Sequence, residues 1–521
     1  MGFLSISVPD RSYKWWALGA TTIGCFMSIL DTSIVNIALP TMMTAFSVDT
    51  DSAEWILTAY MLTMGVLQPA TGYFCDVFGT RRMYLFSLAL FTAGSALCGS
   101  AWSNDSMIFF RVIQAMGGGL IIPVSMAIVY QVFPPAERNM AMGIWGISAM
   151  VAPAVGPTLS GYLVEYWDWR LIFTVNIPVG IIGYLLASMV LRETPLLANR
   201  RFDIAGFLTS SVGLFCLLLA LSKGTDEGWT SAYIMSLFYV AAFCLTMFIF
   251  IELEQENPIL DLTLFKDWNF AFSNIVLFLG TIGLFGGIFL IPLFMQNLMD
   301  YSAIQTGILM FPAAASSGLM MPIAGRLADK FGAKPVVLTG MAILTLSSLY
   351  LTVVDLDVAY ERLAWIMMLR GIGLGMSMMP VTVLGMHGVP LPKISRASSL
   401  INAVRQVSGS LGIAILGTVL QNRQIYHLYH MAESQNIASL ATAKMLAHGE
   451  QMFIGRGDVP GVAHLKALAL LSGIVQRQAA VFSFDDAFLI MALICGLAII
   501  PSLALRSVKA KAGMEKTVMA E

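Results

Sequence analysis

Asp31 is the residue whose type and position in the chain most clearly point to chemistry. It is the only acid that falls deep within one of the long apolar runs of the sequence. A charge at that depth in a membrane costs several kcal/mol, so it usually faces a partner or a water-filled cavity and marks function. A carboxylate with restricted access to water can gain and lose a proton near neutral pH. We therefore predict that Asp31 is a proton-carrier site. The alternative is a structural acid that Thr32, Ser33 and Asn36 satisfy.

Three arginines, Arg111, Arg370 and Arg405, also fall within apolar runs. Arg111 is the predicted partner of Asp31, because a nearby cation favours the ionised carboxylate and its withdrawal favours protonation. The alternative is that Arg111 bonds polar groups such as Gln114 and only holds helices together. For Arg370 and Arg405 two interpretations stay open: each could meet an anionic group on a substrate, or bond backbone carbonyls.

A set of polar and flexible apolar side chains in the same runs is predicted to line a substrate cavity. Methionine is unbranched and adapts to varied ligands, although the 34 methionines of the chain also make some clustering expected. The predicted cavity residues are Asn36, Gln114, Arg370, Met376, Met379 and Arg405.

The apolar runs that carry these residues decide the class of protein. Hydrophobic residues make up 57% of the 521 positions and charged residues 12%, against roughly 25% charged residues in ordinary soluble domains. A run of about 20 apolar residues crosses a bilayer as a helix, because backbone polar groups in lipid must be satisfied within the segment. We therefore predict an all-α polytopic membrane protein with fourteen transmembrane helices. They fall at about residues 15–40, 53–74, 83–101, 107–130, 139–164, 170–190, 204–221, 232–252, 270–294, 303–325, 335–354, 361–386, 397–420 and 484–505.

The distribution of Lys and Arg sets the expected orientation, since positively charged short loops stay in the cytoplasm. With the N-terminus inside, most of the 29 Lys and Arg residues lie at the termini or in loops on the same side. Both termini are therefore predicted to be cytoplasmic. The segment 422–483 is then a long loop on the outer side, with helical patterns at 437–446 and 462–475 and a Gly/Pro break at 455–461.

Several classes of function find no support in the sequence. The net charge of −2 offers no basic field for nucleic acid. The six cysteines have no regular spacing and are predicted to be packing residues, and the histidines of the long loop do not complete a metal site. No G-x4-GK[ST] phosphate loop and no nucleophile–base constellation is present. We expect neither an enzyme nor an ATP-driven pump, no metal and no cofactor, with the proton as coupling ion.

Two loops on the predicted cytoplasmic side repeat the pattern G-x3-D-x2-G-x-[RK]. Their members are Gly72, Asp76, Gly79, Arg81 and Arg82 after the second span, and Gly325, Asp329, Gly332 and Lys334 after the tenth. Matching loops at equivalent places imply two related six-helix halves. The predicted division is an N-terminal bundle at 1–200, two inserted linker helices at 201–256 and a C-terminal bundle at 257–521. The acids of each loop are expected to pair with the basic residues nearby, as latches that hold the halves together; such pairs are weak singly.

These loops resemble the signature cytoplasmic loop of the major facilitator superfamily. Four further stretches are similar to the fourteen-span drug:proton antiporters of the EmrB/QacA type. They lie at 30–40, at 111–119, at 152–161 with 169–178, and at 257–265. The resemblance runs from the first span to the last, and implies two pseudo-symmetric bundles with two linker helices and multidrug efflux from the cell inner membrane.

The resemblance also suggests roles for particular residues and partners. It implies that Arg111 tunes protonation of the coupling machinery, and that the outer loop can meet a periplasmic adaptor protein and, through it, an outer-membrane channel. An antiporter motif of the fifth span is associated with export in this family, with general helix packing as the alternative. Its members here are Pro153, Gly156, Pro157 and Gly161.

The sequence as a whole predicts a proton-coupled secondary exporter of hydrophobic or amphipathic small molecules that works by alternating access within the lipid bilayer. The alternatives are proton-coupled uptake or lipid transport on the same fold, and a membrane sensor. The resemblance also bears on the substrate, because some relatives that take dications carry an extra acid within the tenth span. Here that span, from 302 to 325, holds no acid. The resemblance therefore disfavours dicationic substrates, which leaves neutral, weakly acidic or monocationic compounds.

Overall fold

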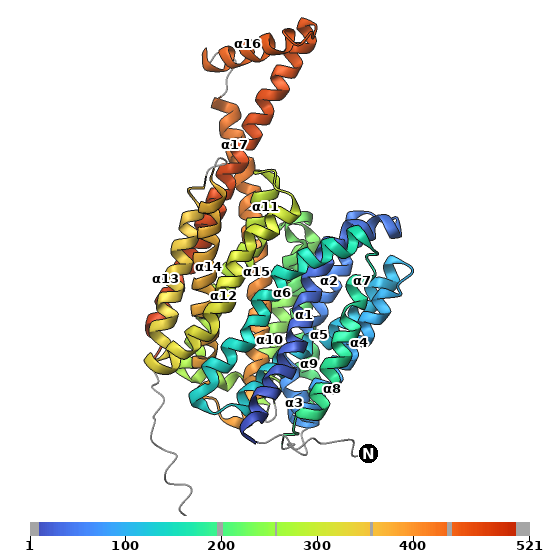
Figure 1. Cartoon of the computed structure of the whole chain (residues 1–521), viewed down its shortest axis with the longest axis vertical. Helices are drawn as coiled ribbons and strands as arrows, with labels where there is room; N and C mark the ends of the chain where they lie inside the picture. Colours follow the sequence, from blue (N-terminus) through green and yellow to red (C-terminus); the bar gives the residue numbers. More distant parts are fainter. Residues whose placement is uncertain (1–9, 195–201, 256–257, 355–357, 435–439, 507–521) are drawn as a thin grey trace, which may run out of the picture.

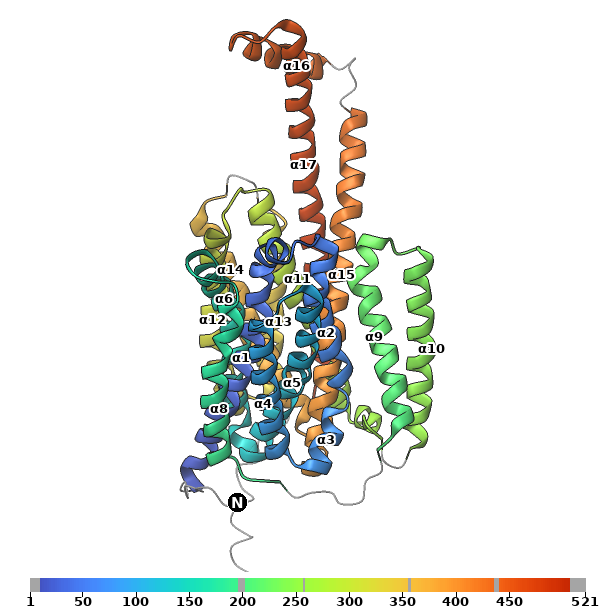
Figure 2. The same cartoon turned by 90° about the vertical axis from the view of Figure 1, so that its right-hand side faces the viewer.

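The structure is a computed structural model that describes residues 10–194, 202–255, 258–354, 358–434 and 440–506. Within these ranges the chain forms helices and turns and no strand, as the sequence predicts. The helices stand side by side in one bundle, from which a narrower pair rises at one end (Figures 1 and 2).

The first part of the chain forms eight helices that occupy the place of the first six predicted spans. They are α1 (Asp10–Phe46), α2 (Thr50–Leu67), α3 (Thr71–Phe78), α4 (Thr80–Gly99), α5 (Asn104–Val132), α6 (Arg138–Tyr166), α7 (Leu171–Thr174) and α8 (Asn176–Val190), with the 3-10 turn η1 (Pro135–Glu137) before α6. The second predicted span is divided into α2 and α3, and the sixth into α7 and α8.

The rest of the chain supplies the linker pair and the second group. The linker helices are α9 (Ile204–Glu227) and α10 (Ala232–Glu254). They are followed by η2 (Leu262–Lys266), α11 (Trp268–Asn297), α12 (Ala303–Phe331), α13 (Ala333–Leu351), α14 (Tyr360–Met386), η3 (Leu391–Lys393), α15 (Ile394–Ser434), α16 (Leu440–Ile454), α17 (Pro460–Leu497) and α18 (Ile499–Ala504).

The structure bears out thirteen of the fourteen predicted spans by length and composition. In the described part of the chain, thirteen helices are long and apolar enough to cross a membrane. The remaining predicted span is α2, which carries Asp51 and Glu54 near its start and packs against α5 in the bundle. The helices α9 and α10 pack on each other at the edge of the bundle, and α9 contacts α2 and α15 (Figure 2). The predicted domain boundaries at 200 and 256 fall beside or within 195–201 and 256–257, outside the described residues, and stay predictions.

The two groups of helices share an apolar core at one end of the bundle only. We call the end where α1 begins and α18 lies the inner end, and the end that faces α16 the outer end (Figure 1). Toward the inner end one cluster of buried side chains joins both groups, with Tyr130 and Trp145 from the first group and Met321, Met379 and Leu400 from the second. Toward the outer end each group has its own cluster instead. The halves are therefore closed against each other at the inner end, while α6 and α12 stay in contact over most of their length.

The two repeated loops adopt the same turn. Gly79 lies between α3 and α4 with φ 89° and ψ 147°, and Gly332 lies between α12 and α13 with φ 92° and ψ 150°. Only glycine adopts this conformation without strain. The sequence repeat is thus also a repeat of backbone geometry.

The same loops attach each half to the other. A Cβ on Gly72 would lie 2.7 Å from Cα of Arg396 at the start of α15, and a Cβ on Gly325 would lie 2.5 Å from the carbonyl oxygen of Asn139 at the start of α6. Asp76 Oδ2 accepts a hydrogen bond from Arg396 Nε at 2.8 Å, and these two side chains are 5% exposed. Asp329 Oδ1 accepts from Asn139 Nδ2 at 2.6 Å.

These contacts differ from the predicted latches. The basic residues of the loops bond within their own halves: Arg81 donates to the carbonyl of Ser188 at 2.7 Å, Arg82 lies 3.5 Å from Glu193, and Lys334 donates to the carbonyl of Leu503 at 2.6 Å. The acids and the basic residues stand on opposite sides of the glycine turn. The acids therefore face the other half, and the bases face their own.

A second ion pair orders the inner end of the C-terminal half. Asp261 caps η2 by accepting from the backbone of Thr263, and its Oδ2 lies 2.6 Å from Lys393 Nζ of η3. Burial opposes ionisation of Asp261, but the bonds from Lys393 and Thr263 outweigh it and lower the pKa of this carboxyl below its usual range. This carboxylate therefore stays ionised and holds the entry to α15 next to the entry to α11.

The predicted outer loop at 422–483 is mostly a continuation of two membrane helices. The helix α15 has 41 residues and α17 has 38, so each is about 60 Å long at 1.5 Å per residue. They rise together beyond the bundle, and α16 lies across their end (Figures 1 and 2). His427 of α15 lies 2.8 Å from Asp486 of α17 and ties the pair at its base. We call the part from 422 to 483 the outer hairpin. Of its predicted helical patterns, the second lies in α17, and the first overlaps 435–439, which lie outside the described residues.

The close approach of Gly72 to α15 predicts that Gly72→Ala loosens the inner end. Cys75 of α3 is buried against Ser395 of α15 and serves as a built-in reporter. A bias of about 1 kcal/mol changes a two-state ratio roughly fivefold. We expect the alkylation rate of Cys75 to rise by about that factor, measured in a background whose other five cysteines are serine.

Gly19→Ala is the matched control, because a Cβ at Gly19 would meet no atom within 4 Å. An unchanged alkylation rate in Gly72→Ala, or an equal rise in Gly19→Ala, would show that the contact between α3 and α15 does not keep the two halves closed at the inner end.

Candidate functional site

Asp31 lies at the centre of a buried polar network that joins α1, α5 and α8. Its Oδ2 accepts from Arg111 Nη1 at 2.6 Å. Its Oδ1 accepts from Gln114 Nε2 at 2.8 Å and from Asn176 Nδ2 at 3.0 Å. All four side chains are at most 1% exposed. Three donors and no acceptor face the carboxylate, which is the arrangement that an ionised carboxylate requires.

Ser95 of α4 extends this network. Its hydroxyl accepts from both Gln114 Nε2 and Asn176 Nδ2 at 3.1 Å, and donates to the carbonyl of Phe173 at 2.9 Å. Gln114 Oε1 in turn accepts from Arg111 Nη1 at 2.9 Å. The amide groups of Gln114 and Asn176 are therefore fixed in orientation, because each amide nitrogen donates both to Asp31 Oδ1 and to the hydroxyl of Ser95.

The guanidinium of Arg111 is held on two sides besides its contact with Asp31. Its carbon lies 3.9 Å from the centre of the Tyr60 ring, within the range of a cation–π contact. Its Nε donates to the carbonyl of Ile56 on α2 at 3.4 Å. The Tyr60 hydroxyl is buried and has no hydrogen-bond partner in the described structure. The arginine thus connects α2 to the carboxylate on α1.

The predicted antiporter motif lies against α1 directly beside Asp31. Ser33 Oγ donates to the carbonyl of Pro153 at 3.2 Å, and a Cβ on Gly156 would lie 2.5 Å from that hydroxyl oxygen. One turn further, Ser160 Oγ donates to the carbonyl of Ile34 at 2.8 Å. The motif therefore brings α6 into close contact with the segment of α1 that carries Asp31. A Cβ at Gly161 would meet nothing within 4 Å, and the side chain of Pro157 lies outside the described set.

The residues predicted to line a substrate cavity do not lie together. Asn36 is exposed on the outer half of α1, and Gln114 belongs to the Asp31 network. Met376 is half-buried and Met379 is buried, with its sulfur near Gly146 of α6.

The two remaining arginines have different surroundings. Arg370 is buried and donates to Ser348 Oγ at 2.9 Å and to the carbonyl of Gly283, within the C-terminal half. Arg405 is half-buried, and its Nη2 donates to Thr382 Oγ1 at 2.6 Å.

Three members of the Asp31 network are missing from the residues predicted to act there. Asn176 stands in a stretch that resembles the family, which was a usable signal. Ser95 and Tyr60 carry no such mark, since serine and tyrosine are common in apolar helices. Only the packing of α2 and α4 against α5 brings them to the carboxylate.

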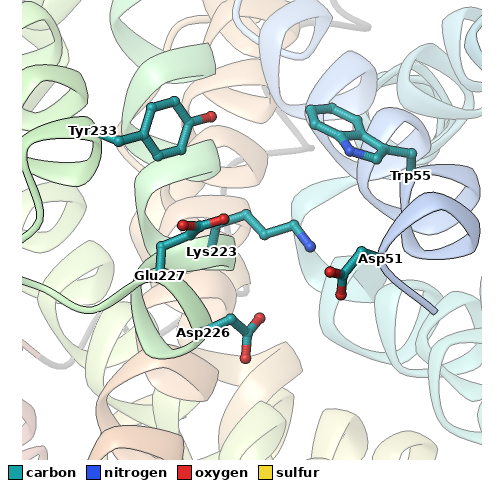
Figure 3. A pocket seen from close by; sticks show the side chains of 6 residues that line it. All are labelled: Asp51, Trp55, Lys223, Asp226, Glu227 and Tyr233. Atoms are coloured by element: carbon teal, nitrogen blue, oxygen red, sulfur yellow. The ribbon is translucent and has the colours of Figure 1, made fainter. Parts of the chain in front are cut away.

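A cavity of about 430 Å³ lies at the outer end, between α2 and the turn that joins the end of α9 to the start of α10 (Figure 3). Lys223 of α9 reaches across it toward α2 and donates to Glu54 at 2.6 Å. The residues that line it are Asp51, Trp55, Lys223, Asp226, Glu227 and Tyr233. The ion pair fastens α9 to the first half. Neither here nor elsewhere among the described residues could a group of three or more His, Cys, Asp or Glu side chains hold a metal ion.

Comparisons with known proteins identify the family and agree with the fold. Residues 21–413 match the family model described as Major Facilitator Superfamily. The chain is similar to multidrug resistance protein Stp of Mycobacterium tuberculosis, with 34% identity over 77% of this chain and 75% of that protein. It is also similar to multidrug export protein EmrB of Escherichia coli, with 31% identity over 80% of this chain and 82% of that protein. Among solved structures, it resembles the proton:xylose symporter XylE, with a TM-score of 0.61, 13% identity, and coverage of 96% of this chain and 98% of that chain.

The contact between Asp31 and Arg111 predicts a strong coupling between two substitutions. Removing one partner of a buried ion pair leaves an uncompensated charge, which costs about 3–5 kcal/mol. We expect Asp31→Asn and Arg111→Gln each to destabilise the purified protein by about that amount. The double variant should be more stable than either single one, as measured by unfolding in detergent in a double-mutant cycle.

Asp168→Asn serves as the control, because Asp168 and Arg170 form an exposed pair at 3.9 Å, and such pairs contribute about 0–1 kcal/mol. If the two core substitutions gave strictly additive losses, Asp31 and Arg111 would not depend on each other for stability.

Proposed function

Because the chain belongs to the major facilitator superfamily, we propose that it is a proton-coupled exporter of hydrophobic or amphipathic small molecules, of the fourteen-span drug:proton antiporter type. The proposal depends above all on one observation: a fully buried carboxylate, Asp31, paired with a fully buried arginine, Arg111. A multi-pass membrane transporter needs a group that binds the coupling ion in one state and releases it in another. Asp31 is the carboxylate of the membrane-spanning core that has such surroundings.

In the proposed cycle, the pair is made and broken. With the outer side open, a proton reaches Asp31 and neutralises it, which removes its attraction for Arg111. The arginine then keeps Ile56, Tyr60 and Gln114 as partners, so it is not left alone in the core. Since Ser33 and Ile34 of α1 bond α6 next to Asp31, a shift of α1 is transmitted to α6. The helix α6 in turn packs on α12 of the other half.

The conformation supports alternating access. The shared core and the cross-contacts of Asp76 and Asp329 are at the inner end, and the apolar clusters are separate toward the outer end. We infer that this is the outward-facing state, with the inner end and both termini in the cytoplasm of a cell whose inner membrane holds the protein. Exchange to the inward-facing state would have to break the contacts of α3 with α15 and of α6 with α12.

Export of toxic compounds is proposed from the relatives. Stp is named a multidrug resistance protein and EmrB a multidrug export protein. The helix α12 carries Asp329 and no other acid, and Asp329 lies at its inner end against Asn139. A dication would find no carboxylate along the membrane part of this helix, which favours neutral, weakly acidic or monocationic substrates.

The driving force is sufficient without a cofactor. One proton that enters brings about 2.3 kcal/mol per 100 mV of membrane potential and about 1.4 kcal/mol per pH unit. We propose no other coupling ion and no enzymatic step.

We also propose that the outer hairpin docks a periplasmic adaptor protein, through which an outer-membrane channel is reached. The hairpin presents exposed apolar side chains on both of its long helices, among them Ile425, Tyr429, Leu465 and Leu468. Apolar surface of this kind outside the membrane is typical of a protein interface.

Proton coupling predicts that substrate binding displaces a proton from Asp31. Purified wild-type protein in weakly buffered detergent should release protons when a transported hydrophobic compound is added near neutral pH. Asp31→Asn should bind the compound without release. Glu54→Gln, which alters the outer pair with Lys223, should release protons as the wild type does.

Normal proton release in Asp31→Asn would contradict the proposal that Asp31 is the proton-carrier site. If protons and substrate moved in the same direction in proteoliposomes, the protein would be a proton-coupled uptake transporter and not an exporter.

The adaptor proposal predicts a separation of two activities. A variant with the tip of the outer hairpin replaced by a short turn should keep proton-driven transport in proteoliposomes, because the Asp31 network lies deep in the bundle. The same variant should lose most of its protection of intact cells against toxic compounds. Full protection of intact cells would argue against a docking role.

A further inference from the structure

Arg405 is a cation in the membrane core that no acid of the described structure neutralises. Its single hydrogen bond runs from Nη2 to Thr382 Oγ1, and no carboxylate of the described residues lies within ion-pair distance. A guanidinium has five N–H donors, so most of its bonding capacity is not used by protein side chains. The other two core arginines differ, because Arg111 is paired with Asp31 and Arg370 is enclosed by Ser348 and the carbonyl of Gly283.

The position of Arg405 places it between the two halves. It belongs to α15, and Thr382 belongs to α14, both of the C-terminal half. Opposite them are Cys25 of α1 and Tyr130 of α5, the two side chains of the first half with which the guanidinium interacts electrostatically. Cys25 in turn contacts Ser148 of α6. The surroundings of Arg405 therefore come from five helices, and they change whenever the halves move relative to each other.

A second observation at the same place points to a ligand. The hydroxyl of Tyr130 is fully buried and has no hydrogen-bond partner in the described structure. A buried hydroxyl without a partner costs about 1–3 kcal/mol, so it calls for an explanation. Arg138 lies on the face of the Tyr130 ring, 5.3 Å from its centre, and does not satisfy the hydroxyl. Tyr130 and Arg405 can thus both donate to a group placed between the halves.

The side chain of Arg405 is less enclosed by protein than those of the other two core arginines. Arg405 is half-buried, whereas Arg111 and Arg370 are at most 3% exposed. A cation in the core that lacks a counter-ion is suited to bind an anionic ligand. Since the halves have separate cores toward the outer end, the anion would enter or leave between them.

We propose that Arg405, with the hydroxyl of Tyr130, binds the anionic head group of an amphipathic substrate, and that organic monoanions such as hydrophobic carboxylates are the transported class. The inference rests on the proposed function and names the substrate class of that exporter. The buried methionines of the shared core, Met126 and Met379 among them, supply adaptable apolar contacts for the rest of the molecule.

The proposal has an electrical consequence. Exchange of one entering proton for one leaving monoanion moves two elementary charges in the same sense. Exchange for a neutral compound moves one, and exchange for a monocation moves none. A negative potential inside the cell would therefore drive export of a monocarboxylate more strongly than export of a neutral or monocationic compound.

The test compares one carboxylate with its neutral amide. Wild-type protein in lipid nanodiscs is titrated calorimetrically with 1-naphthylacetate and with 1-naphthylacetamide at pH 7.5. We expect Arg405→Gln to weaken binding of the carboxylate by about tenfold or more, the effect of losing a hydrogen bond to a charged group, and to leave binding of the amide unchanged. Arg405→Lys should fall between the two, because it keeps the charge and loses the fork of donors.

The matched control is Arg423→Gln, which removes a half-exposed cation of the same helix that is paired with Asp486 at the base of the outer hairpin. It should leave both affinities unchanged. The proposal is overturned if the wild type does not prefer the carboxylate, or if Arg405→Gln weakens both ligands equally, which would indicate a packing role. Unfolding temperatures of all variants exclude a general loss of structure.

A separate measurement distinguishes this proposal from the proposed function. Proteoliposomes with an imposed pH gradient report whether wild-type protein moves either compound against protons. Arg405-dependent binding without proton-driven transport would support the anion site and contradict the proposed antiport. Proton-driven transport of the amide, without a preference for the carboxylate, would support the proposed antiport and contradict the anion site.

Discussion

The contact between Asp31 and Arg111 is the interaction on which the N-terminal half depends. One carboxylate collects donors from α5 and α8, and the arginine behind it holds α2 through Tyr60 and a carbonyl. Bringing two charges out of water is costly, and the cost is offset because both oxygens of the acid accept hydrogen bonds. The carboxylate is thus the point at which α1, α5 and α8 are joined. If Asp31 carries the coupling proton, as we propose, its neutralisation would remove this joining point.

The two halves differ at equivalent places in the repeat. Arg111 on α5 and Arg370 on α14 lie on the fourth span of their respective halves, and each bonds a network that includes a serine of the preceding span, Ser95 of α4 or Ser348 of α13. In the C-terminal half the carbonyl of Gly283 stands where the first half has a carboxylate. A carbonyl does not titrate, so the network of Arg370 has no counterpart of the proton site that we propose at Asp31. The backbone of the glycine turn is the same in both halves, whereas the side chains of the buried network are not.

The sequence predicts what depends on local composition and fails where partners come from distant helices. Apolar run length was enough for thirteen of the fourteen predicted spans, and the rarity of deep charges was enough to single out Asp31 and Arg111. The partners of Asp76 and Asp329 were predicted from neighbours in sequence, yet they are Arg396 and Asn139, which lie 320 and 190 residues away. Gln114 was expected in a cavity because it is polar, but packing placed it on Asp31. The outer hairpin was predicted as a loop because its residues are polar enough for water, although the helices α15 and α17 simply continue.

The continuity of α15 and α17 gives the molecule a lever. Both helices belong to the C-terminal half, and their outer parts carry α16 well beyond the bundle (Figure 1). A straight helix transmits rotation without loss, so a tilt of about 10° would displace a point roughly 20 Å above the pivot by about 4 Å, at 1.5 Å of helix per residue. The rocking of one half inside the membrane would thus be amplified into a swing of α16 outside it. The conformational state of the core could then be followed from the aqueous side, by the position of a single helix.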